Sequence, residues 1–131
     1  MPRQTVDSKS APRAIGPYSH ATWAGDVLYL SGQTPIDPST RELVGEEIGV
    51  QTQRVFDNLV AILDDAGLTT DNVVKCTVYL TTMRDFAGMN AVYQTRFNAP
   101  YPARTTIAVA ELPLGASVEI DVVARRPARF E

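Results

Sequence analysis

Two charged side chains in the last third of the chain are the first candidates for chemistry. Arg104 follows a Pro-Ala pair at the start of a predicted strand, where a guanidinium can bind a carboxylate or phosphate through two hydrogen bonds. Glu119 alternates with Val118 and Ile120, so its carboxylate points away from their apolar face and can act as a base. Each has an ordinary alternative, because such arginines more often form surface ion pairs and such glutamates are more often solvated.

Three polar positions elsewhere can line a binding pocket. Asn90 shares the predicted inner face of a helix with Phe86 and Tyr93, so its carboxamide needs hydrogen-bond partners. Ser31 and Gly32 end a predicted strand and can offer backbone N–H and hydroxyl groups to an anion. A satisfied structural amide and an ordinary loop are the alternative interpretations.

The chain contains one histidine, His20, and one cysteine, Cys76. These counts exclude a disulfide framework, a zinc site of several Cys and His ligands, and a catalytic Cys-His or Ser-His-Asp system without His20. Tyr18 and His20 share one face of a predicted strand, but a lone histidine is usually structural. Cys76 falls in an apolar row and is expected in the core.

The elements that must position these residues follow from hydrophobic periodicity and turn signals. We expect a short edge strand before Pro17, strands over residues 19–24, 27–33, 73–80, 104–110 and 117–124, and helices over residues 46–66 and 82–97. Gly25-Asp26 and residues 112–115 are the turns of two predicted hairpins. This order predicts a single α+β domain over residues 1–131, with one sheet and two helices on one face.

The sheet face without helices is too apolar to remain in contact with water. In residues 73–80, alternation places Val73 and Tyr79 on this face, opposite the row that begins at Val74. Tyr29 and either Ile107 or Thr106 join them. The sequence therefore predicts a homo-oligomer.

Composition and charge narrow the possible functions. The 131 residues are 44% hydrophobic and 21% charged, which is typical of a globular domain and excludes disorder as the main state. A net charge of −3, without a basic run, argues against nucleic acid and anionic lipid as partners. No apolar stretch predicts a membrane span or a secretory signal, so we expect a cytoplasmic protein.

Short motifs along nearly the whole chain carry a family resemblance. They are Ala14-Ile15-Gly16-Pro17-Tyr18-Ser19, Leu30-Ser31-Gly32-Gln33, Asn90, Pro102-Ala103-Arg104 and Val118-Glu119-Ile120. In length, element order and motif placement the chain resembles the Rid family, the reactive intermediate deaminases also called YjgF-type proteins, and within it the RidA subgroup.

The resemblance implies a fold, an assembly and an activity. It implies a chorismate-mutase-like α+β domain that forms a homotrimer, with the sheets around a central β-barrel and the active sites in clefts between subunits. It also implies hydrolysis of 2-imino acids such as 2-aminoacrylate, released by pyridoxal-phosphate enzymes, to 2-keto acids and ammonia. Neither a metal nor a cofactor is expected.

The resemblance also implies roles for individual residues. Arg104 would bind the substrate carboxylate, and Glu119 would activate the attacking water and move protons. The pocket would be lined by Tyr18, Ser31, Gly32, Asn90 and Thr106. Thr106 stands where the RidA archetype has a cysteine, and its β-branched side chain changes the size and polarity of the pocket.

An enamine/imine deaminase of small 2-imino acids is the leading hypothesis. One alternative is a deaminase of a larger, aminomuconate-type substrate, which Thr106 and residues 34–45 would decide. Another is a carboxylate-binding or chaperone-like trimer without turnover, since an arginine-centred pocket can bind without catalysing. The negative charge argues against a ribonuclease.

Overall fold

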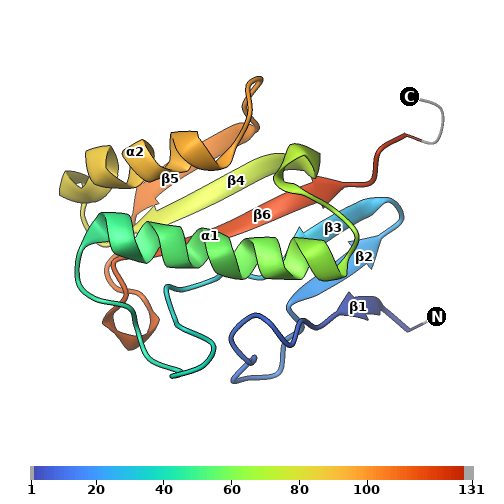
Figure 1. The fold of residues 1–131 in the computed structure, drawn as a ribbon, viewed down its shortest axis with the longest axis horizontal. Coiled ribbons are helices and arrows are strands. Elements are labelled where there is room, and N and C mark those ends of the chain that lie inside the picture. The colour runs from blue at the N-terminus through green and yellow to red at the C-terminus, as the bar shows by residue number, and fades with distance from the viewer. Residues whose placement is uncertain (1, 129–131) are drawn as a thin grey trace.

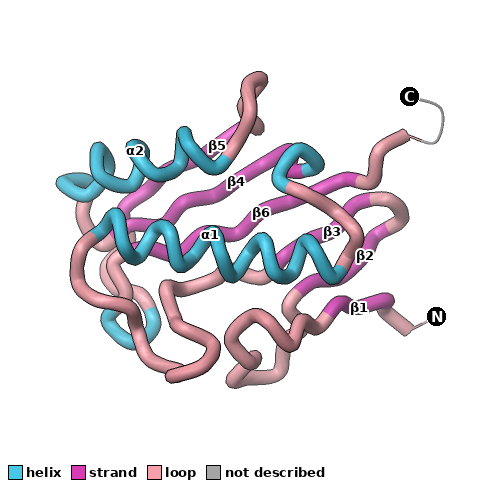
Figure 2. Tube along the Cα trace, viewed as in Figure 1, coloured by secondary structure: helices cyan, strands magenta, loops and turns pink. Residues whose placement is uncertain are grey.

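Two α-helices cover one face of a six-stranded sheet in the computed structural model, which describes residues 2–128 (Figure 1). The elements are β1 (Gln4–Val6), β2 (Ala21–Ala24), β3 (Val27–Leu30), α1 (Ile48–Asp65), β4 (Val73–Leu80), α2 (Phe86–Arg96), β5 (Ala103–Ala108) and β6 (Val118–Arg125). Figure 2 shows both helices on the same side of the strands. The predicted two-layer α+β domain, with its short N-terminal edge strand, is confirmed.

The strand order is β1-β2-β3-β6-β4-β5, in which β4 and β5 are parallel and the other neighbours are antiparallel. The predicted hairpin of β2 and β3 is confirmed, and its turn glycine, Gly25, has a φ of +60°. The predicted C-terminal hairpin is wrong, because β4 lies between β5 and β6. Val118, Ile120 and Val122 of β6 are almost fully buried, and a strand with such a row belongs in the middle of the sheet.

Both helices begin and end close to the predicted positions. Helix α1 ends just before Gly67, whose φ of +76° suits the left-handed position after a helix. The predicted helix over residues 82–97 starts with a 3₁₀ turn, because the Thr82 hydroxyl accepts the Arg84 N–H before α2 begins. Within residues 2–128, no helix combines the length and the apolar character needed to cross a bilayer.

The core fills the space between the helices and the sheet. Helix α1 contributes Val55, Leu59 and Ile62, all at most 1% exposed. The ring of Phe56 meets the rings of Tyr93 and Phe97 edge to face, at centroid distances of 5.8 and 5.5 Å. These contacts fix α1 against α2 and hold the inner face of α2 over the sheet.

A bulge in β4 corrects one prediction. The pairing of β4 with β6 shifts between Val73 and Lys75. Val73 therefore packs in the core at 7% exposed, whereas Val74 is 48% exposed, the reverse of the predicted faces. A bulge adds one residue to a strand and inverts the alternation beyond it, which alternation alone does not reveal.

The sheet face opposite the helices carries exposed apolar side chains, as predicted. Tyr29 is 54% exposed and Ile107 is 43% exposed. Thr106 is paired with the buried Val78 and so lies on the helix side, which leaves Ile107 for the open face. On this face the Tyr79 hydroxyl donates to Asp121 Oδ2 at 3.0 Å, next to Glu119 in β6.

Candidate active site

A cavity of about 760 Å³ contains four of the predicted site residues, namely Tyr18, Ser31, Gly32 and Glu119. Its walls come from the segment before β2, the end of β3, the loop before α1 and the turn before β6. Figure 1 shows these loops gathered at one end and edge of the sheet. A cavity of this volume can enclose a small molecule with room to spare.

Glu119 occupies the cavity directly against Gly32. An isolated bridge joins Gln33 to Ile120, whose backbone groups exchange hydrogen bonds of 2.9 and 3.2 Å, and so brings position 32 next to Glu119. A Cβ atom on Gly32 would lie 2.9 Å from the carboxyl carbon of Glu119, too close for a real contact. A glycine is therefore the residue that leaves room for this carboxylate.

The environment of Glu119 favours its protonated form. The carboxyl group is half-buried, and this burial raises its pKa, to which the negative charge of Asp121 adds. A carboxyl group with a raised pKa exchanges protons with a substrate near neutral pH more readily than an ordinary one. Position 119 is therefore suited to acid–base chemistry.

The segment before β2 is tied to the sheet by Ser31 and His20. Ser31 Oγ donates to the Ser19 carbonyl at 2.6 Å, and the Ser31 N–H donates to the His20 carbonyl at 2.9 Å. The proton of the Ser31 hydroxyl is thus used by the protein, while its oxygen can still accept. The ring of Tyr18, 49% exposed, lies at the edge of the cavity.

His20 has a structural position. Its ring is 3% exposed, its Nδ1 accepts the Ser8 N–H at 2.9 Å, and its Nε2 lies 2.8 Å from the Pro12 carbonyl. These partners fit the tautomer with the proton on Nε2, which then donates to Pro12. His20 thus fastens the chain just before the residues that line the cavity, and it is not among them.

Arg104 and Asn90 meet on the other face of the sheet. Arg104 Nη1 donates to Asn90 Oδ1 at 2.7 Å, and its guanidinium carbon lies 4.5 Å from the ring centre of Tyr93. The Phe86 ring is 5.4 Å away. Within residues 2–128, no carboxylate lies at ion-pair distance from Arg104. The guanidinium is therefore oriented by the protein but keeps its charge for a ligand.

Thr106 lies two residues further along β5 on the same face. Its hydroxyl oxygen is buried without a hydrogen-bond partner among the described residues, as is the hydroxyl of Tyr93. Cys76 is completely buried, and this burial raises the pKa of its thiol to about 11. The thiol is therefore a core group, as predicted, and is not a nucleophile at neutral pH.

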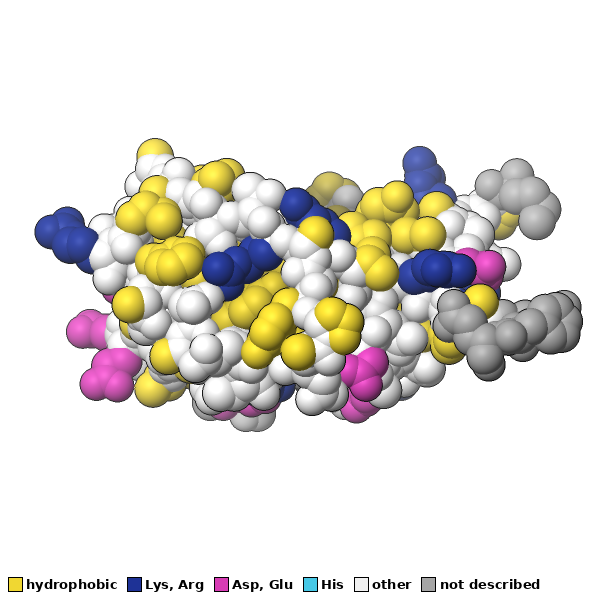
Figure 3. All heavy atoms as spheres, turned by 90° about the horizontal axis from the view of Figure 1, so that it is seen from above, with side chains coloured by type: hydrophobic (Ala, Val, Ile, Leu, Met, Phe, Trp, Pro, Cys, Tyr) yellow, Lys and Arg dark blue, Asp and Glu magenta, His cyan; other side chains and the backbone are white. Residues whose placement is uncertain are grey.

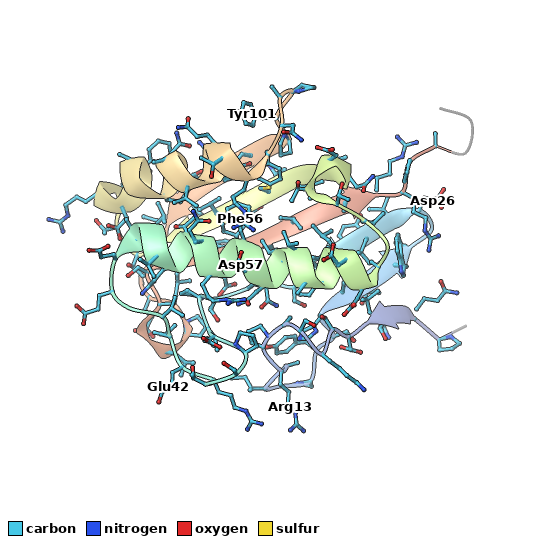
Figure 4. The ribbon with its side chains drawn as sticks, in the orientation of Figure 1. Arg13, Asp26, Glu42, Phe56, Asp57 and Tyr101 are labelled. Atoms are coloured by element: carbon cyan, nitrogen blue, oxygen red, sulfur yellow. The ribbon has the colours of Figure 1, made fainter. Side chains whose placement is uncertain are left out.

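The predicted site residues thus form two separate groups within one chain. Arg104 is paired with Cys76, whose side chain faces the helices, whereas Glu119 is paired with Tyr79, whose side chain faces away from them. In Figure 4, Tyr101, just before β5, and Arg13, on the wall of the cavity, lie at opposite edges of the molecule. The structure brings Asn90 and Thr106 to Arg104, and it brings Tyr18, Ser31 and Gly32 to Glu119.

Two arginines of the cavity were not predicted. Arg13 and Arg41 line it together with Glu119. Both are exposed loop residues, and no signal in the sequence distinguishes them from the other arginines. Among residues 2–128, no group of three or more His, Cys, Asp or Glu side chains is arranged to hold a metal ion.

The loop that carries Arg41 is fastened to α1. The buried amide of Asn58 donates to the carbonyls of Thr34 and Ile36 at 3.1 and 2.9 Å. Gln51 donates to the Gly45 carbonyl at 3.1 Å and accepts the Ser117 N–H at 2.9 Å. These two side chains position one wall of the cavity. Helical periodicity in the sequence predicts only that they belong to a helix and does not reveal this contact.

Comparison with known proteins finds relatives that match nearly the whole chain. A family model described as endoribonuclease L-PSP matches residues 8–126. Protein DfrA of Myxococcus xanthus is 47% identical over 95% of this chain and 96% of its own length. A Dermatophagoides farinae protein named 2-iminobutanoate/2-iminopropanoate deaminase is 38% identical, covering 93% of this chain and 95% of its own.

A solved structure has the same fold. The crystal structure of RidA from an Antarctic Psychrobacter species superimposes with a TM-score of 0.91 at 42% identity, covering 95% of this chain and all (100%) of that one. At this identity and coverage, the two chains share one fold.

Proposed function

Because the chain belongs to the Rid (YjgF-type) family, which the endoribonuclease L-PSP model describes, we propose that it hydrolyses reactive 2-imino acids to 2-keto acids and ammonia. One observation carries the proposal: the Arg104 guanidinium is fixed by Asn90 and two aromatic rings, yet no acid among the described residues pairs with it. Such a group is a receptor for a carboxylate, which every 2-imino acid has. The relative named 2-iminobutanoate/2-iminopropanoate deaminase supports the same reaction.

The proposal requires Arg104 and Glu119 to contact one substrate, although they lie on opposite faces of the sheet. We therefore place the active site between two subunits of a homotrimer, with Arg104 from one subunit and the Glu119 cavity from its neighbour. The exposed Tyr29 and Ile107 on the open face favour such an assembly. Figure 3 shows hydrophobic and basic side chains side by side on the face that carries α2 and β5.

Within such a site the reaction needs only the groups already described. Arg104 binds the carboxylate of the substrate, and Glu119 accepts a proton from water as its oxygen attacks C2 of the iminium. Glu119 then returns the proton to the nitrogen of the resulting carbinolamine. The C–N bond then breaks and releases ammonia, while Glu119 takes the proton of the hydroxyl group, whose oxygen becomes the keto oxygen. Glu119 passes this proton to the ammonia, which leaves as ammonium.

An enamine such as 2-aminoacrylate enters the same path after one earlier step. Protonation of its terminal carbon converts the enamine into the iminium, and the protonated form of Glu119 can supply that proton. The raised pKa of this carboxyl group keeps more of the protonated form available near neutral pH. Because imines already hydrolyse in water, a placed water and one proton carrier suffice for acceleration.

A coupled assay tests the proposal. A pyridoxal-phosphate dehydratase generates 2-aminoacrylate, and the decay of the imine is followed with wild-type protein, with Arg104→Ala and without added protein. We expect faster decay with the wild type and at least about tenfold less acceleration with Arg104→Ala, since hydrogen bonds to charged groups contribute about 1.5–3 kcal/mol.

Arg84→Ala is the matched control, because Arg84 is an exposed arginine whose side chain donates a hydrogen bond only to the nearby Thr82 hydroxyl among the described residues. Full acceleration by Arg104→Ala would refute the assigned role of the arginine. Saturable binding of 2-oxobutanoate by the wild type, without faster imine decay, would instead assign a carboxylate-binding function.

A further inference from the structure

The cavity around Glu119 is more positive than the chain as a whole. The chain has a net charge of −3, but the described residues that line the cavity include two arginines, Arg13 and Arg41, against one acid, Glu119. A cavity lined by an excess of one charge concentrates ligands of the opposite charge.

Neither arginine has an acid partner in the part of the chain that the structure describes. Arg54 and Arg96 pair with Asp57, and Arg126 pairs with Asp26, at 3.0 to 4.0 Å. No carboxylate within residues 2–128 lies at that distance from Arg13 or Arg41. Their charges are therefore available to a ligand in the cavity.

Arg41 sits on a structured turn. Asp37 Oδ1 accepts the backbone N–H and the hydroxyl of Ser39 at 2.8 and 2.7 Å, and the Asp37 carbonyl accepts the Arg41 N–H at 2.8 Å. Arg41 itself has a φ of +66°, a conformation that residues other than glycine rarely adopt. The turn thus displays the guanidinium from a defined backbone position.

In the single subunit, before a neighbour brings Arg104 to it, the cavity is also larger than a three- or four-carbon imino acid requires. Its volume of about 760 Å³ lies in the range of pockets that hold drug-sized ligands. Ile15, Ile36 and Leu114 contribute apolar wall to it. A ligand that fills this space has an apolar chain beyond its reacting carbon.

We infer that the preferred substrates are 2-imino acids whose side chain ends in a second carboxylate, which Arg13 and Arg41 bind. This inference rests on the proposed function, in which Arg104 of a neighbouring subunit binds the first carboxylate and Glu119 serves the reacting carbon. The hydrolysis is unchanged, since the distal carboxylate takes no part in the bonds that form or break.

Binding of product analogues tests the inference without turnover. 2-Oxoglutarate and 2-oxopentanoate have the same number of carbons and differ at the distal end, so calorimetric titration isolates the second carboxylate. We expect about fivefold tighter binding of 2-oxoglutarate, as for a partly exposed ion pair. The preference should shrink at high ionic strength.

Two variants assign the preference to residues. In the double variant Arg13→Gln, Arg41→Asn the affinity ratio should fall toward one, and asparagine tolerates the left-handed backbone at position 41. Arg3→Gln removes the charge of an exposed arginine outside the cavity and should keep the ratio. A ratio that survives the double variant, or a wild-type ratio of one, would overturn the inference.

Rates separate this inference from the proposed function. An amino-acid oxidase generates 2-iminoglutarate from glutamate or 2-iminopentanoate from norvaline, and the decay of each imine is compared. Equal acceleration of both would overturn the inference and support the deaminase activity. A binding preference for 2-oxoglutarate without acceleration of either imine would refute the deaminase activity and support the distal carboxylate site.

Discussion

At the scale of single residues, the site depends on what surrounds Glu119. Its carboxylate occupies the space that a side chain at position 32 would need, and Asp121 lies on the same face of β6. The first contact fixes where the carboxylate lies, and the second influences when it is ionised. Each gives a prediction that a single substitution tests.

Gly32→Ala should lower the rate of imine hydrolysis about ten- to hundredfold, because the added methyl group displaces the Glu119 carboxylate. Gly49→Ala is the control, since a Cβ there meets only Val92, at 3.9 Å. Imine decay and thermal unfolding are measured together. A Gly32→Ala variant with the wild-type rate would contradict the close contact with Glu119.

Asp121→Asn should move the acidic limb of the pH–rate profile to lower pH. Burial and the charge of Asp121 raise the pKa of Glu119. In the proposed reaction a substrate supplied as the imine, such as 2-iminopentanoate, requires the ionised carboxylate from the start, so its rate rises as the pH passes this pKa. Removing the charge of Asp121 lowers the pKa of Glu119. The control is Asp57→Asn, in α1 and remote from Glu119 in the fold, which should leave the acidic limb of the profile at the wild-type pH. If Asp121→Asn also left it there, Glu119 would not be the base.

The same raised pKa has a consequence for stability. The folded state keeps the proton of Glu119 to a higher pH than the unfolded chain, whose carboxyl group has the ordinary value of 4.5. This group therefore lowers the free energy of unfolding as the pH rises from the ordinary pKa through the raised one. Glu119→Gln should lack that decrease, which urea unfolding at a series of pH values would measure.

At the scale of elements, α1 packs on the sheet and also positions a loop. Its apolar face builds the core, while Gln51 and Asn58 reach the segment between β3 and α1. The buried amide of Asn58 donates to two carbonyls of that segment and so fixes the segment against the helix. The position of this wall of the cavity therefore depends on hydrogen bonds from α1.

Asn58→Ala should lower the free energy of unfolding by about 1–3 kcal/mol, because the carbonyls of Thr34 and Ile36 lose their buried donor. It should also raise KM more than it lowers kcat, since the cavity wall loosens while Glu119 stays on β6. The control is Asn98→Ala, an exposed amide that donates to Asp71. Urea unfolding and imine kinetics would check both effects, and a variant as stable as the wild type would contradict the anchoring role.

At the scale of the whole molecule, the sheet separates the two halves of the proposed site. Arg104, Asn90 and Thr106 lie on the helix side of β5 and its neighbour α2, whereas Glu119 faces the open side. One chain alone cannot place both groups on one small substrate. In a ring of identical subunits, however, each interface brings different faces of two neighbours together.

Mixed trimers of Arg104→Ala and Glu119→Gln subunits should therefore recover activity. An active interface needs Arg104 from a Glu119→Gln subunit and Glu119 from an Arg104→Ala subunit. When the two variants mix at random in equal amounts, about a quarter of the interfaces have this combination. We expect about a quarter of the wild-type rate after unfolding and refolding the two variants together. Mixing either one with the double variant should recover nothing, and failure of the first mixture would place the site within one chain.

Much of the fold could be predicted from the sequence, because periodicity and turn residues act locally. Apolar spacing identified both helices, and Gly67 marked the end of the first. The inward position of Asn90 also followed from helical spacing, which is why its contact with Arg104 was within reach of sequence reasoning.

The sequence by itself determined the elements, the faces of most side chains and the motifs that indicate the family. Only the tertiary structure decided that β6 lies between β3 and β4, that β4 has a bulge, and that Arg13 and Arg41 line the cavity with Glu119. The physical reason is that alternation and helical spacing depend on neighbours along the chain. Strand partners, bulges and the convergence of loops are instead selected by the burial and hydrogen bonding of the whole sheet.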